Sequence, residues 1–173
     1  MGEPRGILSE DSRMNRTAQE RAVDHSISKR VSLEQSRISS TLDQNGSPFL
    51  LTSKGSIDFG ALKKEDGVKA GPMRLSIGDA ENGYTHIESR HGAQIRKAGH
   101  RSILDFIEYV GGHYTRVVPG KEYENESGGK NKTYYVQLVD DHNNTLYVQL
   151  SRDGSYWNIN SAGIFRKNYP KRV

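Results

Sequence analysis

His86 and Arg90 are residue types that can transfer a proton and bind a phosphate group, and they lie one helical turn apart. The spacing of Thr85 and Glu88 predicts a capping box, which makes His86 the first residue of a helix. Free backbone N–H groups and the helix dipole favour an anion at this end, and the guanidinium of Arg90 can bind a phosphate from the same face. An imidazole has an unperturbed pKa of about 6.5, so His86 is a candidate general base. An exposed histidine beside a surface arginine is the alternative.

His91 belongs to the apolar side of the same predicted helix, together with Tyr84, Ile87 and Ile95. One interpretation is a buried histidine that is hydrogen-bonded to a strand backbone. The other places His91 in a cleft between helix and sheet, as a second group for proton transfer. At five positions from His86, it does not share a helical face with that residue.

Polar side chains alternate with apolar ones in residues 155–161, which predicts a half-buried strand. Tyr156, Asn158 and Asn160 are expected to point away from the apolar face, whereas Ser161 points with the apolar residues unless the strand contains a bulge. Asparagine can hydrogen-bond to base edges, and a tyrosine can stack on a base for about 1–3 kcal/mol. These four residues are candidates for substrate binding, and a solvated polar face is the alternative.

Two helices and four strands must position these residues. The first helix is expected to end at Gly99, and the second to begin at Ser102 and stop at Gly111-Gly112. Four alternating segments then predict an antiparallel meander of sequential neighbours, and their ranges are 115–118, 133–139, 145–151 and 155–161. The two helices are expected to cover its apolar face, and the opposite face is rich in tyrosine and amide side chains.

Shorter apolar segments precede the helices, at residues 49–52, 56–59 and 73–77, and are predicted to form short strands or an arm. The expected fold class is therefore α+β, with two helices followed by a four-stranded antiparallel sheet meander and an N-terminal arm. Residues 1–45 contain no aromatic side chain and predict a polar linker or tail, disordered or partly helical. Residues 46–173 are predicted to form the folded domain.

The composition excludes several kinds of chemistry. The chain of 173 residues has no cysteine, which excludes disulfides, thiol catalysis and cysteine-based zinc sites. The spacing of His86 and His91 does not match the paired histidines of a zinc-protease helix, so no metal and no cofactor is expected. No apolar run is long enough to span a membrane. The last twelve residues hold four basic and no acidic side chains, which predicts either a phosphate-attracting patch or a solvated tail.

Several separated segments resemble one family: 72–78 (PMRLSIG), 84–92 (YTHIESRHG) and 151–165 (SRDGSYWNINSAGIF), with a similar lead-in at 54–60 (KGSIDFG). They are similar to the barnase/colicin-type endoribonuclease domains (barnase–EndoU–colicin–RelE-like) of phage and mobile-element polyvalent proteins and bacterial polymorphic toxins. The resemblance covers roughly residues 47 to 167.

The resemblance implies a metal-independent endoribonuclease, with active-site candidates on the first helix (His86, Arg90, His91) and the last strand. We expect transesterification, in which a ribose 2′-OH attacks the adjacent phosphorus and leaves a 2′,3′-cyclic phosphate. His86 is the expected base and His91 the acid or orienting partner. Arg90 and the helix amides would stabilise the charge on the phosphorane, while the polar residues of the last strand hold the nucleotide.

The expected partners are RNA, with tRNA as one candidate, and an antitoxin or immunity protein. The expected site of action is the cytoplasm, reached also by delivery as part of a larger secreted or injected protein. Two other functions stay open: an ADP-ribosyltransferase-like toxin that uses NAD, and a non-catalytic module that binds RNA or protein.

Overall fold

A computed structural model of the chain describes residue 33 and residues 35–124 and 132–165. Most of the predicted tail and the basic residues after Phe165 lie outside this part. The elements are η1 (Gln35–Arg37), β1 (Ile38–Leu42), β2 (Pro48–Leu50), β3 (Ala61–Leu62), η2 (Lys64–Asp66), β4 (Gly71–Arg74), α3 (Tyr84–Lys97), α4 (Ile103–His113), β5 (Arg116–Glu124), β6 (Lys132–Val139), β7 (Asn144–Leu150) and β8 (Trp157–Ile164).

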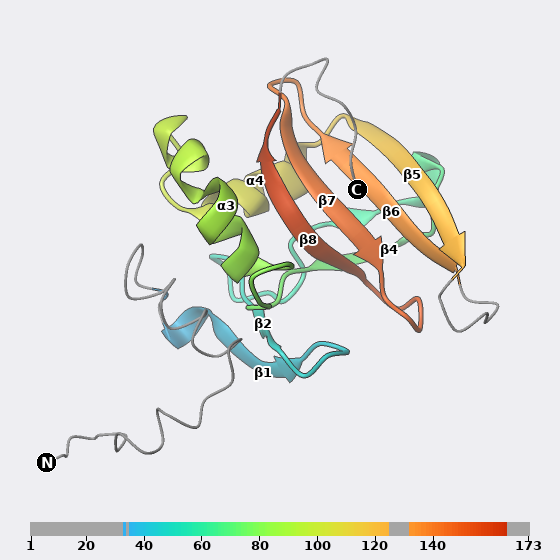
Figure 1. The fold of residues 1–173 in the computed structure, drawn as a ribbon, viewed down its shortest axis with the longest axis horizontal. Helices are drawn as coiled ribbons and strands as arrows, with labels where there is room; N and C mark the ends of the chain where they lie inside the picture. Colours follow the sequence, from blue (N-terminus) through green and yellow to red (C-terminus); the bar gives the residue numbers. More distant parts are fainter. Residues whose placement is uncertain (1–32, 34, 125–131, 166–173) are drawn as a thin grey trace, which may run out of the picture.

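A strongly curled sheet with the strand order β3-β4-β8-β7-β6-β5 dominates the fold (Figure 1). Strands β5 to β8 pair with their sequence neighbours in antiparallel fashion. The segment before the helices adds β3 and β4, and β4 runs parallel to β8, with Met73 opposite Trp157. The prediction of a sheet made only of the four strands after the helices is therefore wrong. The segment at residues 73–77 is predicted to form a short strand or an arm, but local alternation does not identify its partner, because that partner lies far away in the sequence.

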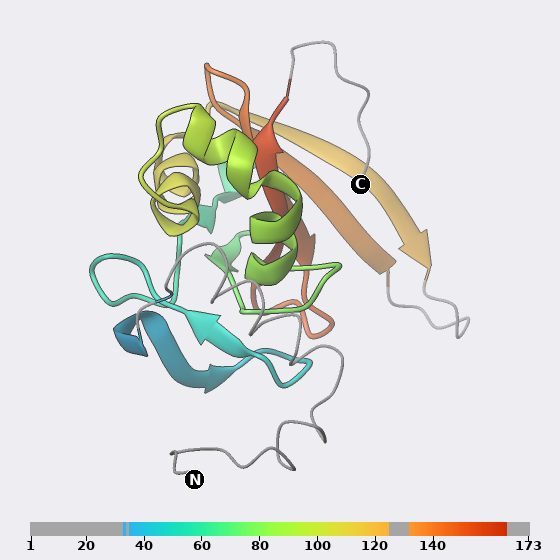
Figure 2. The same cartoon turned by 60° about the vertical axis from the view of Figure 1, so that its left-hand side comes forward.

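The first two strands form a separate two-stranded sheet, in which Ile38 lies opposite Leu50. The expected boundary between residues 45 and 46 falls in the turn that joins them. Backbone hydrogen bonds tie β2 to the chain after β4: the Leu50 N–H donates to the Leu75 carbonyl, and the Ile77 N–H donates to the Pro48 carbonyl. This small sheet lies below the helices, near the first turn of α3 (Figures 1 and 2).

The core lies between the helices and one face of the large sheet, where burial of apolar surface drives folding. Helix α4 packs on β6 and β7, whereas α3 runs alongside β8. The expectation that both helices cover the apolar face thus holds for α4, while α3 lies at the edge of β8. The fully buried side chains of this core include Ile87, Ile95, Phe106, Ile107, Val136, Leu138, Leu146, Val148, Trp157 and Ile159.

Helix α4 begins as predicted, because the Ser102 hydroxyl accepts a hydrogen bond from the Asp105 N–H at 3.1 Å. Its predicted end is wrong: the helix continues through Gly111 to His113. A Cβ atom at Gly111 would lie 2.0 Å from the Phe59 carbonyl oxygen, so this glycine serves close packing and does not end the helix.

Candidate functional site

Backbone hydrogen bonds fix the start of α3 against the sheet. The Gly83 N–H donates to the Asn160 carbonyl on β8 at 2.9 Å, and the N–H groups of Tyr84 and Thr85 donate to the carbonyls of residues 76 and 77. These amides are therefore occupied, and they do not form the anion site expected at this helix end. Their role is to hold the first turn, with His86, over β8.

The predicted capping box is also wrong. The helix begins at Tyr84 after Gly83, which has a φ of 86° and no side-chain cap. Thr85 is buried, and the Glu88 carboxylate forms an ion pair with Arg96 instead of reaching back to the helix start. The three amides find backbone partners, so a side-chain cap is not needed.

A bulge in β8 decides which way Ser161 points. Tyr147 lies opposite Ser161, and Val148 lies opposite Ile159, so Asn160 is an extra residue on the β8 side. The alternation changes at this point, and the side chains of Asn160 and Ser161 both face the polar side of the sheet. Ser161 therefore does not point with the apolar residues, as a regular strand would require, because the strand contains a bulge.

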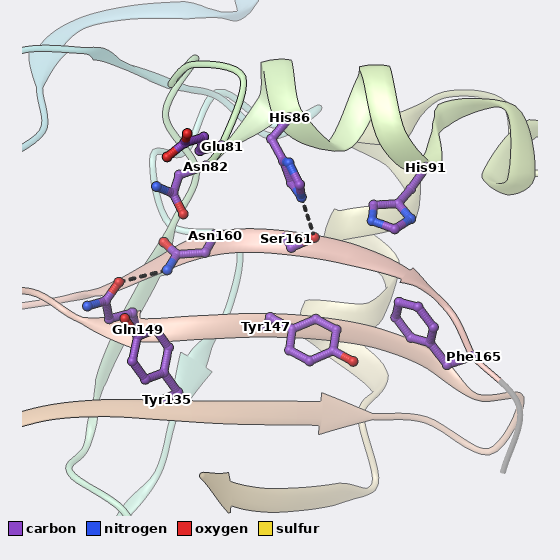
Figure 3. Close-up of a pocket in the computed structure, with 10 residues that line it drawn as sticks. All are labelled: Glu81, Asn82, His86, His91, Tyr135, Tyr147, Gln149, Asn160, Ser161 and Phe165. Atoms are coloured by element: carbon purple, nitrogen blue, oxygen red, sulfur yellow. Dashed lines mark hydrogen bonds between the residues drawn. The ribbon is translucent and has the colours of Figure 1, made fainter. Parts of the chain in front are cut away.

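A pocket of about 440 Å³ opens between α3 and the polar face of β6, β7 and β8. Figure 3 shows the two histidines of α3 pointing toward the sheet, with the labelled polar and aromatic side chains of the strands spread over the sheet below them. Ten residues line it: Glu81, Asn82, His86, His91, Tyr135, Tyr147, Gln149, Asn160, Ser161 and Phe165.

Two hydrogen bonds hold the half-buried ring of His86. Its Nδ1 lies 3.1 Å from the Ala80 carbonyl oxygen, and its Nε2 lies 3.0 Å from the Ser161 hydroxyl (Figure 3). A carbonyl oxygen only accepts, so Nδ1 carries the proton in the neutral ring and Nε2 accepts from Ser161. The nitrogen with the free electron pair is therefore the one that faces the pocket, as a general base requires.

His91 lines the same pocket one turn further along α3. Its ring centroid lies 5.7 Å from that of His86 and 5.9 Å from that of Phe165, both in edge-on arrangements. Burial lowers the pKa of His91 below its ordinary value of 6.5, and the nearby His86 and Arg90 lower it further. His91 is therefore a neutral imidazole at neutral pH, and its protonated form is a stronger acid than an ordinary imidazolium.

Arg90 does not join the pocket. Its side chain is exposed on α3 and is not among the lining residues, although its charge influences His91. The i+4 spacing predicted that Arg90 shares a helical face with His86. In the structure the His86 ring points toward β8, whereas the Arg90 side chain lies at the surface.

Tyr156 lies away from the pocket, at the other end of the polar face. Its ring packs edge-on against Phe49 at 5.3 Å, and its hydroxyl accepts from the Gln44 N–H at 3.1 Å. Tyr156 directly precedes β8, and since strand residues advance by about 3.3 Å each, it lies too far from Asn160 to reach the same cavity. Its role is to hold the turn between β1 and β2.

Asn158 does not line the pocket but orients Asn160. The Asn158 Nδ2 donates to the Asn160 Oδ1 at 2.6 Å, and the Asn160 Nδ2 donates to the Gln149 Oε1 at 2.7 Å. Three amide side chains on β8 and β7 thus form one hydrogen-bonded chain, and Asn160 and Gln149 are its members in the cavity (Figure 3).

Sequence reasoning missed several lining residues. Alternation assigns Tyr135, Tyr147 and Gln149 to the same polar face as Asn160, and this shared face was a usable signal. Phe165 follows the end of β8, and the loop residues Glu81 and Asn82 belong to no periodic segment, so no pattern points to them.

No protein-family model, curated protein or solved structure matches this chain. Within residues 35–124 and 132–165, no three His, Asp or Glu side chains are grouped so that they could hold a metal ion. None of the described helices is long and apolar enough to cross a membrane. The site is therefore interpreted from its own geometry.

Proposed function

We propose that this protein is an endoribonuclease that cleaves RNA by transesterification through the 2′-OH, without a metal ion. The observation that carries the proposal is the pair of imidazoles in one pocket, of which His86 holds its Nε2 within 3.0 Å of the Ser161 hydroxyl. This reaction requires two groups for proton transfer, one at the attacking 2′-oxygen and one at the leaving 5′-oxygen.

The reaction needs one base and one acid. The 2′-oxygen attacks the adjacent phosphorus while its proton passes to Nε2 of His86. The bond from phosphorus to the 5′-oxygen then breaks as this oxygen takes a proton from the imidazolium form of His91, which leaves a 2′,3′-cyclic phosphate and a 5′-OH end. Ser161 keeps the His86 ring in place through its hydrogen bond to Nε2 until the substrate hydroxyl arrives.

The polar side chains of the strands would hold the nucleotide, and Asn160 and Ser161 are the predicted binding residues that line the cavity. Arg90 is exposed and lies outside the pocket, so its role in the proposal is attraction of the RNA backbone from the surface. The proposed partner is RNA, and an enzyme of this kind requires an inhibitor protein in any cell that makes it.

The test is incubation of the full chain with end-labelled RNA in the presence of EDTA. The expected products carry a 2′,3′-cyclic phosphate and a 5′-OH, and the double variant His86→Ala/His91→Ala yields none. His142→Ala, which removes an exposed histidine between β6 and β7, is the matched control and should cleave like the parent. Absence of cleavage, or cleavage undiminished in the double variant, would contradict the proposal.

The contact between Ser161 and His86 supports a second candidate, a serine-dependent acyl hydrolase. Here the Ser161 Oγ attacks an ester carbonyl, His86 Nε2 takes its proton, and the Ala80 carbonyl orients the ring. A fluorophosphonate probe separates the two functions, because it would label Ser161 in this hydrolase only.

Incubation with labelled NAD tests the ADP-ribosyltransferase alternative in the same way, since a ribonuclease transfers no label.

A further inference from the structure

Aromatic and amide side chains form a regular array on the polar face of the sheet. Tyr135 on β6 lies opposite Gln149 on β7, and one step along the strands Tyr147 on β7 lies opposite Ser161 on β8. The two tyrosines therefore occupy diagonal positions on neighbouring strands, and an amide side chain flanks each of them. Both rings are half-buried and line the pocket (Figure 3).

Hydrogen bonds already orient the amide side chains of this array before any ligand binds. The chain from Asn158 through Asn160 to Gln149 fixes two amide groups beside the tyrosine rings, at the edge of the pocket (Figure 3). A planar heterocycle that stacks on a tyrosine ring would have its edge within hydrogen-bonding reach of these amides. Amide groups carry both a donor and an acceptor, which is the combination that nucleobase edges bind.

The charge of the lining favours a base over a phosphate group in this part of the pocket. None of the ten lining side chains is a lysine or an arginine, and Glu81 is the one carboxylate. The lining residues on the strands and directly after β8 are tyrosines, a phenylalanine, a glutamine, an asparagine and a serine, none of which carries a positive charge. A phosphate would be poorly stabilised there, whereas a neutral aromatic ring fits the surface.

Tyr147 is the tyrosine that lies closest to the proposed chemistry. It is the direct cross-strand neighbour of Ser161, which hydrogen-bonds to His86 Nε2. Adjacent strands are about 4.8 Å apart, so a base on the Tyr147 ring belongs to the nucleotide whose ribose reaches His86. That nucleotide carries the attacking 2′-OH.

We propose that Tyr147, together with Gln149 and Asn160, binds the unpaired base of the nucleotide on the 5′ side of the cleaved bond, so that the substrate class is single-stranded RNA. This inference rests on the proposed function, because it places the base relative to the general base. Base-paired RNA keeps its base faces stacked and its edges paired, and its deep groove hides them, so a duplex cannot deliver a base into this pocket.

The experiment measures binding rather than cleavage. The full chain carrying His86→Ala is titrated against a short fluorescein-labelled single-stranded RNA and against the duplex of the same sequence, with fluorescence anisotropy as the readout. We expect the single strand to bind at least about tenfold more tightly. Tyr147→Leu should weaken this binding by about fivefold or more, because it removes one stacking surface.

Tyr147→Phe and Tyr109→Leu are the controls. The first keeps the ring and should bind within about twofold of the parent, and the second removes an exposed tyrosine on α4 and should change nothing. A thermal melt shows whether Tyr147→Leu is folded; if it is not, an abasic site in the RNA removes the other partner of the stack and should weaken binding to the parent by a similar factor. Equal binding of single strand and duplex, or unchanged binding by folded Tyr147→Leu, would overturn the inference.

Failure of the inference and failure of the proposed function give different results. If the parent protein cleaves no RNA while single-strand binding still depends on Tyr147, the base site stands and the nuclease proposal fails. If the parent cleaves RNA and Tyr147→Leu binds and cleaves it equally well, the nuclease proposal stands and the base site fails.

Discussion

At the scale of single residues, His86 and His91 differ in what holds them. Both ring nitrogens of His86 take part in hydrogen bonds, whereas His91 packs edge-on against the rings of His86 and Phe165. Their spacing does not place them on one face of a helix, yet both line the pocket, because the curled sheet passes beneath the first two turns of α3 (Figure 3). Because His91 is a neutral imidazole at neutral pH, the fraction of molecules in which it holds the proton of an acid grows as the pH falls.

The lowered pKa of His91 predicts the pH dependence of cleavage. As the acid, His91 must be protonated, so kcat/KM falls as the pH rises through its pKa in the free enzyme, which lies below 6.5. We expect this descending limb in a profile of kcat/KM from about pH 4.5 to 8 on a defined single-stranded RNA, and its loss in His91→Gln. A profile of the same shape in His91→Gln would show that another group is the acid.

Ser161 positions the base in the proposed reaction, and its removal should therefore reduce the rate without abolishing it. One lost hydrogen bond corresponds to about 1 kcal/mol, so Ser161→Ala should lower kcat by about three- to tenfold with little change in KM. Ser161→Thr keeps a hydroxyl and should recover most of the rate, and Ser89→Ala on the exposed side of α3 serves as a control. Complete loss of RNA cleavage in Ser161→Ala would show that Ser161 does more than position the His86 ring.

At the scale of elements, α3 completes an unfinished edge of the sheet. Strand β4 pairs with β8 only near Trp157 and Asn158, so the rest of that edge needs other partners. Gln94 on α3 supplies one: its amide accepts from the Ile164 N–H at 3.0 Å and donates to the Ile164 carbonyl at 2.8 Å. The helix thus satisfies the strand's backbone, and the same docking places its histidines over the polar face.

The two adjacent glycines of α4 predict opposite effects on stability. A methyl group at Gly111 would lie 2.0 Å from the Phe59 carbonyl oxygen, and Gly111→Ala should therefore lower the free energy of unfolding by about 1–3 kcal/mol or more. Gly112 has no atom within 4 Å of such a methyl group, and Gly112→Ala should raise the free energy of unfolding by up to about 1 kcal/mol through helix propensity.

Urea unfolding of the two alanine variants and the parent measures both changes. Since the substitutions are identical and neighbouring, intrinsic helix propensity contributes similarly to each, and the difference reports the contact with Phe59. Equal stabilities of the two variants would show that α4 and the chain at Phe59 can move apart at little cost.

At the scale of the whole molecule, the turn between β1 and β2 is tied to the hairpin between β7 and β8. The Arg152 backbone N–H donates to the Gln44 side-chain oxygen, its guanidinium donates to the Gln44 carbonyl, and the Tyr156 hydroxyl accepts from the Gln44 N–H. The residues just before position 46 are therefore part of the fold, even though composition alone groups them with the polar tail.

These contacts predict different outcomes for two deletions. Removal of residues 1–45 eliminates β1 and the Gln44 contacts, whereas removal of residues 1–32 keeps both. We expect the longer deletion to have the lower melting temperature, by several degrees, since losing two or three hydrogen bonds costs about 1 kcal/mol each. Thermal unfolding by circular dichroism compares them, and equal melting temperatures would mean that β1 contributes nothing to the stability of the domain.

The sequence by itself determined the residue types at the site, the capped start of α4, the polar side of strands β6 to β8 and the absence of cysteine chemistry. All of these follow from local periodicity or composition, which depend on neighbouring residues. It also pointed to His86 through its place at the start of a predicted helix, and to His91 through its place on the side of that helix expected to face the sheet.

Only the tertiary structure decided that Ser161 meets His86, that the amides at the start of α3 are occupied, that β4 joins β8 in parallel, and that Arg90 and Tyr156 lie outside the pocket. Each of these depends on a bulge or on a contact between segments distant along the chain. The free energy of such contacts depends on how two separate surfaces pack, and no pattern within either segment contains that information.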